Sequence, residues 1–247
     1  MKLNQLHKSF KINGFVKIEK FFKKRNIKDI LNELPKIQKK VERKSQKNFH
    51  KTKNGKFNSI HNINKFINSG KIIDLSKNKK FIKVLKKFLN DKPQLRNIEF
   101  FLKPAKNKMN TPAHQDNYFW NIINANGVNV WIACSNSSKS NGGVYYYKQS
   151  QNLGTIKHKI SFNRGTSQMI PKEILKNIRF QKVYPKVSPG DIIIHNCEVI
   201  HGSDNNKSKN DRVGMVMSFK GKNSKYDRNK LIQYKKNIKI NLNKIYN

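Results

Sequence analysis

Alanine and arginine are scarce in this sequence. Its 247 residues include only 4 Ala and 7 Arg, whereas Lys, Asn and Ile together make up 109 residues. Codons for Lys, Asn and Ile are rich in A and T, while those for Ala and most of those for Arg are rich in G and C. We therefore interpret the formal net charge of +39 mainly as the signature of an AT-rich genome.

A surface that binds polyanions is the alternative explanation of this charge. A protein that grips nucleic acid is expected to gather its basic residues on one face and to use Arg, whose guanidinium can bind two phosphate oxygens at once. Here the Lys residues are spread along the chain. Nucleic acid is therefore not expected as a partner, and a basic binding protein without catalytic turnover is kept as the alternative function.

Cysteine and long apolar runs are also lacking. The two cysteines, Cys134 and Cys197, cannot form a disulfide framework in a chain of this length, and both lie in apolar stretches. They are expected to be buried free thiols in a reducing compartment. The longest purely aliphatic run is three residues, Ile192 to Ile194, which is too short to span a membrane. No signal peptide is expected near residue 1, so a cytoplasmic location is expected.

The chain divides into three parts of one expected domain, residues 1–247. Residues 1–94 are predicted to be mostly helical around one early strand in "GFVKIEKFF". Residues 95–220 consist of short β-rich runs separated by Gly, Asn, Ser and Pro clusters, which suggests a sandwich or jelly roll. Residues 221–247 are expected to form a marginal helix on the outside or a partly disordered tail. The expected fold class is therefore mainly β with flanking helices.

Two details of the N-terminal part are predicted from local pattern. "RNIKDILNELPKIQKKVER" has apolar residues at helical spacing, with Pro35 as a break or kink. "NFHKTKNGKFNS" is polar and rich in turn-forming residues, so it is expected to be a loop.

His114 and Asp116, in "TPAHQDNYFW", stand two residues apart before a group of aromatic residues. In a β-strand, residues i and i+2 point to the same face, so these side chains would project together and could bind one metal ion. His201, in "VIHGSDN", is the candidate third ligand. Two His and one carboxylate on one face leave other positions open, which is the arrangement of non-haem Fe(II) oxygenases.

Such a pair alone is weak evidence for a metal site, because short motifs often match by chance. A His beside apolar residues is usually a hydrogen-bonded part of the core. His195 competes for the third ligand position, since it lies six residues before His201 in the same apolar segment. The other histidines are interpreted, like His195, as surface or structural residues: His7, His50, His61 and His158.

Arg212 begins the β-rich run "RVGMVMSFK", in which it would share one face with Gly214, Val216 and Ser218. Arg is scarce here, so an Arg at the start of a strand needs a reason. Inside a barrel its guanidinium would match a carboxylate through two hydrogen bonds, and Ser203 could donate to the same anion. The alternative is an Arg paired at the surface with Asp204 or Asp211.

These segments, in this order, resemble the phytanoyl-CoA dioxygenase family of Fe(II)- and 2-oxoglutarate-dependent oxygenases. The resemblance covers most of residues 95–220 and the early "GFVKIEKFF". It is carried by "FFLKPAKNKMNTPAHQDNYFW", "VNVWIACSNSSKSNGGVYYY", "SPGDIII" and "IHGSDNNKSKNDRVGMVMSF". It implies a double-stranded β-helix (a cupin-like jelly roll) with the metal at one mouth of the barrel.

The resemblance also implies roles for individual residues. The positions that match the iron ligands are His114, Asp116 and His201, and those that match the holders of the distal carboxylate of 2-oxoglutarate are Arg212 and Ser203. Trp131 matches an aromatic position beside this cosubstrate, although a core Trp is an equally good interpretation. Lys103 falls in the family's Lys-Pro step and has no assigned role.

The implied reaction consumes O2 and 2-oxoglutarate, releases succinate and CO2, and hydroxylates a small or carrier-linked organic substrate. Asp116 favours hydroxylation, because related halogenases lack this carboxylate. The intact Arg212 speaks against a third interpretation, a cupin-like barrel that holds zinc or no metal and binds sugar without turnover.

The sequence departs from the family pattern at two turns. Asn136 stands where an acidic residue is expected, and Gln149 to Gln151 replace the usual Pro-Gly-Ser-His. This second turn is expected near the barrel rim, which leaves the choice of substrate open. The residues expected to line the substrate side are Gln115, Asn117, Tyr118 and Phe119.

Overall fold

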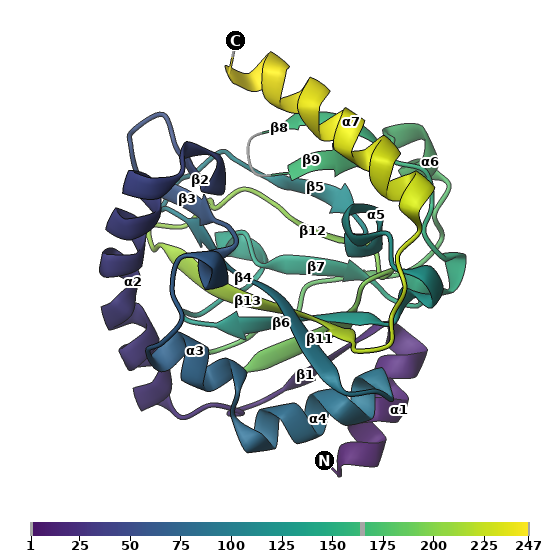
Figure 1. The fold of residues 1–247 in the computed structure, drawn as a ribbon, viewed down its shortest axis with the longest axis horizontal. Helices are drawn as coiled ribbons and strands as arrows, with labels where there is room; N and C mark the ends of the chain where they lie inside the picture. The colour runs from purple at the N-terminus through teal and green to yellow at the C-terminus, as the bar shows by residue number, and fades with distance from the viewer. Residues whose placement is uncertain (1, 164–165, 247) are drawn as a thin grey trace.

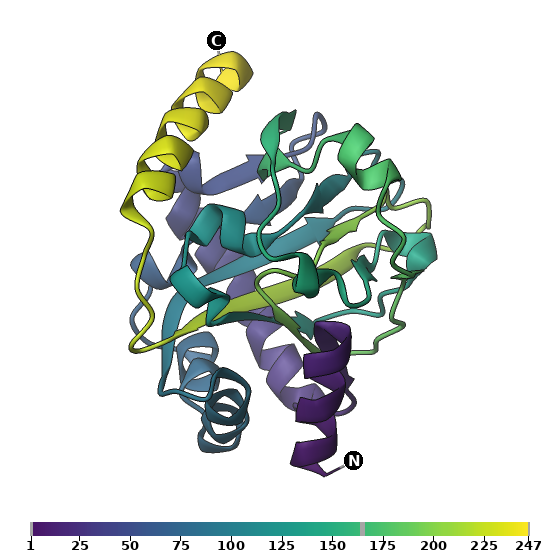
Figure 2. The same cartoon turned by 90° about the vertical axis from the view of Figure 1, so that its right-hand side faces the viewer.

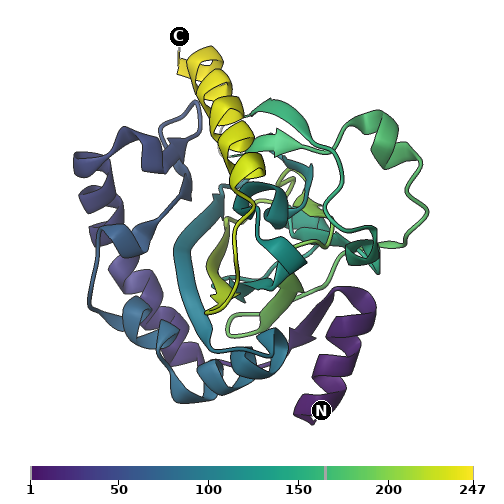
Figure 3. The ribbon, with the colours of Figure 1, turned by 45° about the vertical axis from the view of Figure 1, so that its right-hand side comes forward.

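The computed structural model describes residues 2–163 and 166–246. Two larger antiparallel sheets face each other, β8 and β9 form a third, two-stranded sheet, and helices surround them (Figure 1). The larger sheet has the strand order β1-β11-β6-β13-β4-β3-β2, and the smaller has the order β10-β7-β12-β5. The two sheets enclose an interior between them (Figure 3). This confirms the expected fold class, a mainly β jelly roll with flanking helices.

The bounds of the elements are as follows. The strands are β1 (Phe15–Ile18), β2 (Phe49–Lys51), β3 (Phe57–Ile60), β4 (Pro93–Lys103), β5 (Thr111–His114), β6 (Gly127–Ala133), β7 (Val144–Tyr147), β8 (Lys159–Asn163), β9 (Thr166–Met169), β10 (Lys182–Val183), β11 (Ile192–Asn196), β12 (His201–Ser203) and β13 (Arg212–Gly221). The α-helices are α1 (Leu3–Asn13), α2 (Lys24–Lys44), α3 (Lys71–Ser76), α4 (Lys79–Leu89), α5 (Asp116–Trp120), α6 (Lys172–Lys176) and α7 (Arg228–Tyr246).

The helices of the N-terminal part cover the outer face of the larger sheet. In α2, buried apolar residues recur every three or four positions and join one core with apolar residues of the sheet. The buried residues of this helix are Ile27, Ile30, Leu34, Ile37 and Val41. The predicted break at Pro35 is wrong, since α2 continues through it. Pro35 lies on the exposed side, and buried residues before and after it anchor both halves to the sheet.

Residues 49–60 are not the expected loop, because β2 and β3 form a hairpin at the edge of the larger sheet. The Phe49 and Phe57 rings lie 5.5 Å apart across the hairpin, and the Lys51 ammonium lies over both. This cross-strand packing stabilises strands that are too short to show an alternating pattern. Because β3 pairs with β4, the hairpin places His61, the residue after β3, beside the interior of the barrel.

The C-terminal part contains a 19-residue helix, α7, which packs against β8, β9 and α5. It crosses one open end of the barrel (Figures 1 and 3), while the N-terminus lies at the opposite end of the molecule (Figure 2). A helix was one of the two expectations for residues 221–247. Its position over the barrel mouth was not expected.

Alternation along β13 divides its side chains between two environments. Met215 and Met217 join the core beneath the N-terminal helices, while Val216 packs in a second cluster between the sheets. Arg212, Val216 and Ser218 line the interior, as the predicted common face requires. The cysteines are buried free thiols as predicted, and burial raises the pKa of Cys134 to about 12. Among the described helices, none is both long and apolar enough to cross a membrane.

Candidate metal centre

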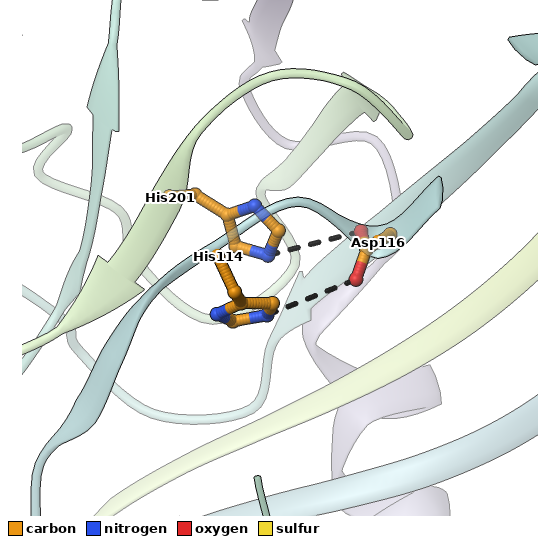
Figure 4. Close-up of side chains that lie close together, drawn as sticks. All are labelled: His114, Asp116 and His201. Atoms are coloured by element: carbon orange, nitrogen blue, oxygen red, sulfur yellow. Dashed lines mark ion pairs between the residues drawn. The ribbon is translucent and has the colours of Figure 1, made fainter. Parts of the chain in front are cut away.

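The interior between the two sheets contains a cavity of about 350 Å³. His114, Asp116 and His201 meet on its wall, and each is at most 8% exposed. One potential ligand atom from each residue lies within 4.8 Å of the other two. The three side chains come from three elements but point at one another (Figure 4).

The backbone brings these side chains together differently from the predicted strand. β5 ends at His114 and α5 begins at Asp116, so the carboxylate belongs to the first turn of a helix. An acidic side chain is favoured at that position by the positive end of the helix dipole. His201 is the direct partner of His114 in the β5–β12 pairing. The prediction that His114 and Asp116 project together is confirmed, but the reason given for it, a continuous strand, is wrong.

Each of the two imidazoles turns a nitrogen with a free lone pair toward the side of the cavity where the carboxylate lies. The Nδ1–H of His114 donates to the carbonyl of Pro112 at 2.8 Å, and the Nδ1–H of His201 donates to that of Val199 at 3.0 Å. Each Nε2 then carries a lone pair and lies 3.8 Å (His114) or 3.7 Å (His201) from an oxygen of Asp116. These separations are too long for hydrogen bonds.

The protonation states favour the same arrangement. Burial lowers the pKa of His201 to about 3 and also lowers the pKa of His114, so both rings are neutral. Burial alone would raise the pKa of Asp116, but the rings of His201 and His195 outweigh it and hold that pKa below its usual value. Two neutral imidazoles and one carboxylate, with donor atoms converging, are a donor set that fits a divalent transition metal.

A buried hydrogen-bond network holds the Asp116 carboxylate in place. Its Oδ2 accepts from Asn129 at 2.6 Å and from the Nε2–H of His195 at 3.0 Å. The hydroxyl of Tyr146 donates to His195 Nδ1 at 3.1 Å, and that of Ser218 donates to Asn129. Both nitrogens of His195 are therefore occupied, so His195 supports Asp116 and does not compete with His201. Its interpretation as structural is consistent with these contacts, but it is not at the surface.

Arg212 lies in the same cavity, away from the protein surface. It is 1% exposed, and its guanidinium donates to the carbonyls of Gly142 at 2.8 Å and Phe101 at 3.3 Å. Within the described residues, nothing accepts from its Nε–H. The alternative of a surface ion pair is wrong, because Arg212 is buried. The Asp211 carboxylate accepts from the backbone of Ala105, and the Asp204 carboxylate has Tyr184 and Lys182 as partners.

Lys103 is the second basic side chain at this end of the cavity. It is the direct partner of Arg212 in the β4–β13 pairing and is 4% exposed. Its ammonium donates to the backbone carbonyls of Ser203 and Asp204. Burial and the nearby Arg212 lower the pKa of Lys103 to about 6. A buried guanidinium next to a buried amine that can take up a proton, both in contact only with carbonyl oxygens, favours binding of an anion.

Ser203 and Trp131 line the cavity, as the resemblance implied. The Arg212 guanidinium carbon lies 5.9 Å from the centre of the Trp131 ring. Gly214 allows the indole to lie against β13, because a Cβ at that position would be 2.3 Å from an atom of the ring. Trp131 also packs in the apolar cluster between the sheets. The core interpretation is therefore confirmed, and a position beside a cosubstrate stays a prediction.

The start of α5 at Asp116 changes which of its residues face the cavity. Phe119 lines it as expected, and so does Trp120, because residues three and four positions further on share a helix face with Asp116. Gln115, Asn117 and Tyr118 do not. The Gln115 amide donates to the carbonyls of Gly154 and Glu198, and Tyr118 stacks on His158.

The turn at residues 149–151 does not line the cavity either. The Gln151 amide donates to the carbonyls of Lys11 and Ile12, so the turn is joined to the end of α1. The Ser150 hydroxyl accepts from the backbone of Ile200. The turn therefore contacts an N-terminal helix and has no contact with the cavity, while the choice of substrate stays open.

Comparison with known proteins gives one family and a common fold. The family model described as "Phytanoyl-CoA dioxygenase (PhyH)" matches residues 10–214. No curated protein matches the chain. Similar solved structures include the epimerase SnoN in complex with Fe3+, alpha ketoglutarate and nogalamycin RO, with a TM-score of 0.71 at 13% identity over 94% of this chain and 88% of that one.

Two further structures have other names. EctD from S. alaskensis, solved with 2-oxoglutarate and 5-hydroxyectoine, has a TM-score of 0.73 at 15% identity, over 90% of this chain and 76% of that one. The alpha ketoglutarate dependent carbocyclase SnoK has a TM-score of 0.71 at 12% identity, over 90% and 85%. At these identities the likeness establishes the shared double-stranded β-helix, and the named activities differ among the three.

Proposed function

Since this chain belongs to the phytanoyl-CoA dioxygenase family, we propose that it is an Fe(II)- and 2-oxoglutarate-dependent dioxygenase that hydroxylates a small or carrier-linked organic substrate. The observation that carries the proposal is the combination in one cavity of a His-Asp-His group and a buried Arg-Lys pair. The overall reaction would convert 2-oxoglutarate, O2 and a C–H bond into succinate, CO2 and an alcohol. We expect residues 1–247 to act as one domain, located in the cytoplasm.

In this proposal His114, Asp116 and His201 hold the iron, which with 2-oxoglutarate and O2 supplies the oxidising power to attack an unactivated C–H bond. The protein contributes ligands that need no rearrangement. The backbone carbonyls of Pro112 and Val199 fix the ring orientation and keep each Nε2 free of hydrogen. The metal therefore does not have to displace a proton from either ring at neutral pH.

Arg212, Lys103 and Ser203 bind the distal carboxylate of 2-oxoglutarate in this proposal. The Arg212 Nε–H has no acceptor among the described residues and would gain one. A carboxylate would also offset the electrostatic cost of the buried Arg212 guanidinium and of a proton on Lys103 beside it. Trp131 forms the cavity wall beside them and excludes water from the anion.

We predict that 2-oxoglutarate binding takes up a proton at Lys103. With a pKa of about 6, the amine is mostly neutral at pH 8, and an adjacent carboxylate would raise that pKa. Calorimetric titrations at pH 8 in buffers of different ionisation enthalpy should show uptake approaching about one proton per ligand. Lys103→Met should abolish the uptake, and the exposed Lys207→Met should not. Uptake that persists in Lys103→Met would place the titrating group elsewhere.

We predict that His195 sets metal affinity through Asp116. His195→Ala removes one of the two donors to Oδ2, and loss of a group that orients a ligand typically weakens metal binding by about 10- to 100-fold. His195→Gln can still donate an N–H and should recover most of the affinity. Titration with Co(II), followed by its visible absorption, measures this effect without turnover. His7→Ala, on α1, is the matched control. If all variants bound Co(II) as tightly as the wild type, the hydrogen bond from Asn129 would be enough to hold Asp116, and the prediction would be wrong.

The test of the proposed function is 2-oxoglutarate turnover by purified, iron-loaded protein against a metabolite library, with succinate as the readout. A substrate should stimulate succinate formation and gain 16 mass units, the mass of one oxygen atom. If succinate formation is stimulated but the product has an unchanged mass, the reaction is an epimerisation. If the product has lost two hydrogens, the reaction is a ring closure, and in both cases hydroxylation is the wrong assignment. The absence of iron-dependent succinate formation in every condition would contradict the proposal.

A further inference from the structure

A bulge in β4 turns an arginine toward the cavity. We call the part of the cavity that is lined by Arg96, Asn97 and Glu99 its outer half. In the β4–β13 pairing Asn97 lies opposite Ser218 and Leu95 lies opposite Phe219, so Arg96 is an extra residue without a partner. An extra residue changes the side to which neighbouring side chains point. As a result Arg96 and Asn97, which are consecutive, both line the cavity.

The Arg96 guanidinium is held in place without being neutralised. Its central carbon lies 4.4 Å from the centre of the Trp120 ring. The two carboxylates of the cavity have other partners, since Glu99 pairs with His61 and Asp116 lies among the histidines. No ion pair of Arg96 is found anywhere in the described part of the chain. Stacking on an aromatic face orients a guanidinium while its N–H groups remain available to an anion.

Two acceptors lie beside this cation on the same strand. The Asn97 Oδ1 is buried and has no donor among residues 2–163 and 166–246. The Glu99 side chain is 16% exposed, and its Oε1 accepts from His61 Nδ1 at 2.8 Å. Because the Nε2 of His61 is in turn hydrogen-bonded to Ser59, the carboxylate is fixed in direction. Two adjacent acceptors match a group with several N–H donors and no lone pair, such as an ammonium.

These groups lie at the level of the metal centre. Ser218 is the strand partner of both Asn97 and Asn129, and Asn129 donates to Asp116. A ligand held by Asn97 and Glu99 would therefore lie close to the His-Asp-His group. Lys103, at the end of β4, and Arg212, at the start of β13, stay free for 2-oxoglutarate.

The C-terminal helix limits the size of what can bind. Tyr234 of α7 lines the cavity, and its ring lies 5.7 Å from that of Phe119, which in turn packs on His114. Burial raises the pKa of Tyr234 to about 12, so its hydroxyl stays protonated. This helix lies beyond residues 10–214, which match the family model.

We propose that the outer half of the cavity selects a small zwitterion, whose acidic group pairs with Arg96 and whose amino group is bound by Glu99 and Asn97. The inference deepens the proposed function, since it names the substrate class of the same site. An anion alone would leave the Asn97 oxygen without a donor and would lie near the Glu99 carboxylate, whose hydrogen bond comes from His61. An amine alone would leave Arg96 without an anion, next to a second positive charge.

Matched ligand series test this inference. The probes are amino acids and short ω-amino acids, their methyl esters, their deaminated acids, and acyl-CoA thioesters as carrier-linked ligands. Binding is measured by thermal shift and by tryptophan fluorescence, because Trp120 lies under Arg96. Both metal-free protein and protein with Fe(II) and 2-oxoglutarate under nitrogen are used. At least one zwitterion should bind at least about tenfold more tightly than its ester and its deaminated analogue, because each analogue loses a charged hydrogen bond.

Variants then assign each preference to one residue. Arg96→Gln should erase the preference for acid over ester, and Glu99→Gln the preference for amine over deaminated analogue, each changing by at least about tenfold. The exposed residues Arg43→Gln and Glu173→Gln are the matched controls and should keep both preferences. A residue with only a structural role would weaken all ligands alike, and that result would overturn its assignment.

The outcomes separate this inference from the proposed function. Zwitterion binding without any 2-oxoglutarate consumption would support the inference and contradict the dioxygenase proposal. Succinate formation that is stimulated by a thioester, with no zwitterion bound, would support the dioxygenase proposal and contradict the inference. Failure of every zwitterion to bind, or tighter binding of the esters or the deaminated acids, would overturn the inference.

Discussion

Asp116→Ala is expected to abolish Fe(II)-dependent succinate formation while the protein stays folded. The variant removes the single carboxylate of the His-Asp-His group and leaves two neutral rings, which bind a divalent ion weakly. Loss of an orienting group alone costs about 10- to 100-fold, so loss of the ligand should exceed about 1000-fold. His114→Ala and His201→Ala should behave in the same way. Succinate formation at saturating 2-oxoglutarate and the Co(II) absorption titration measure the two effects separately.

Folding of these variants is a required control. The three side chains line a cavity and are not members of the apolar clusters, so their truncation should leave the core intact. Circular dichroism and the thermal midpoint, compared with the wild type, verify this. Asp116→Asn keeps the size of the side chain and should also fail, which would exclude a packing defect as the cause. Full turnover by His201→Ala together with an inactive His195→Ala would show that the ligand assignment is wrong.

The sequence predicted best what depends on alternation and local spacing. The common face of Arg212, Val216 and Ser218 needed only the two-residue period of a strand, and it is confirmed. Pairing of His201 with His114 could not be predicted in this way, since it arises from β5 and β12, which are far apart in the chain. Only the choice of His201 as the candidate third ligand was made from the sequence, and the motif order of the family, which carries long-range information, supported it.

The errors share a cause. The repeat of side-chain directions along a strand or helix does not show at which residue that element ends. β5 stops at His114, so Gln115, Asn117 and Tyr118 turn away from the cavity, and Phe119 does not. The bulge at Arg96 has no signature in the alternation of β4. Arg96 could still have been flagged by the scarcity of Arg, the same signal that singled out Arg212. Tyr234 had no local signal at all, because its role depends on where α7 docks.

Arg212→Gln is expected to raise the concentration of 2-oxoglutarate needed for half-maximal rate by at least about 30-fold. Truncating one partner of a buried, hydrogen-bonded charge pair costs about 2–5 kcal/mol, and 2 kcal/mol corresponds to about 30-fold in affinity. The Gln amide can still donate to the carbonyl of Gly142, so the start of β13 should keep its place. The variant therefore removes the positive charge with little change in packing.

The division of the effect between binding and turnover identifies the role of Arg212. A guanidinium that only binds the distal carboxylate should change the 2-oxoglutarate requirement and leave Co(II) affinity, measured without cosubstrate, at the wild-type value. Lys103→Met should show a smaller shift in the same direction, because Lys103 is mostly neutral before the anion arrives. An unchanged requirement in Arg212→Gln would mean that Arg212 serves the backbone carbonyls of Gly142 and Phe101 alone, and 2-oxoglutarate would then have to bind without it.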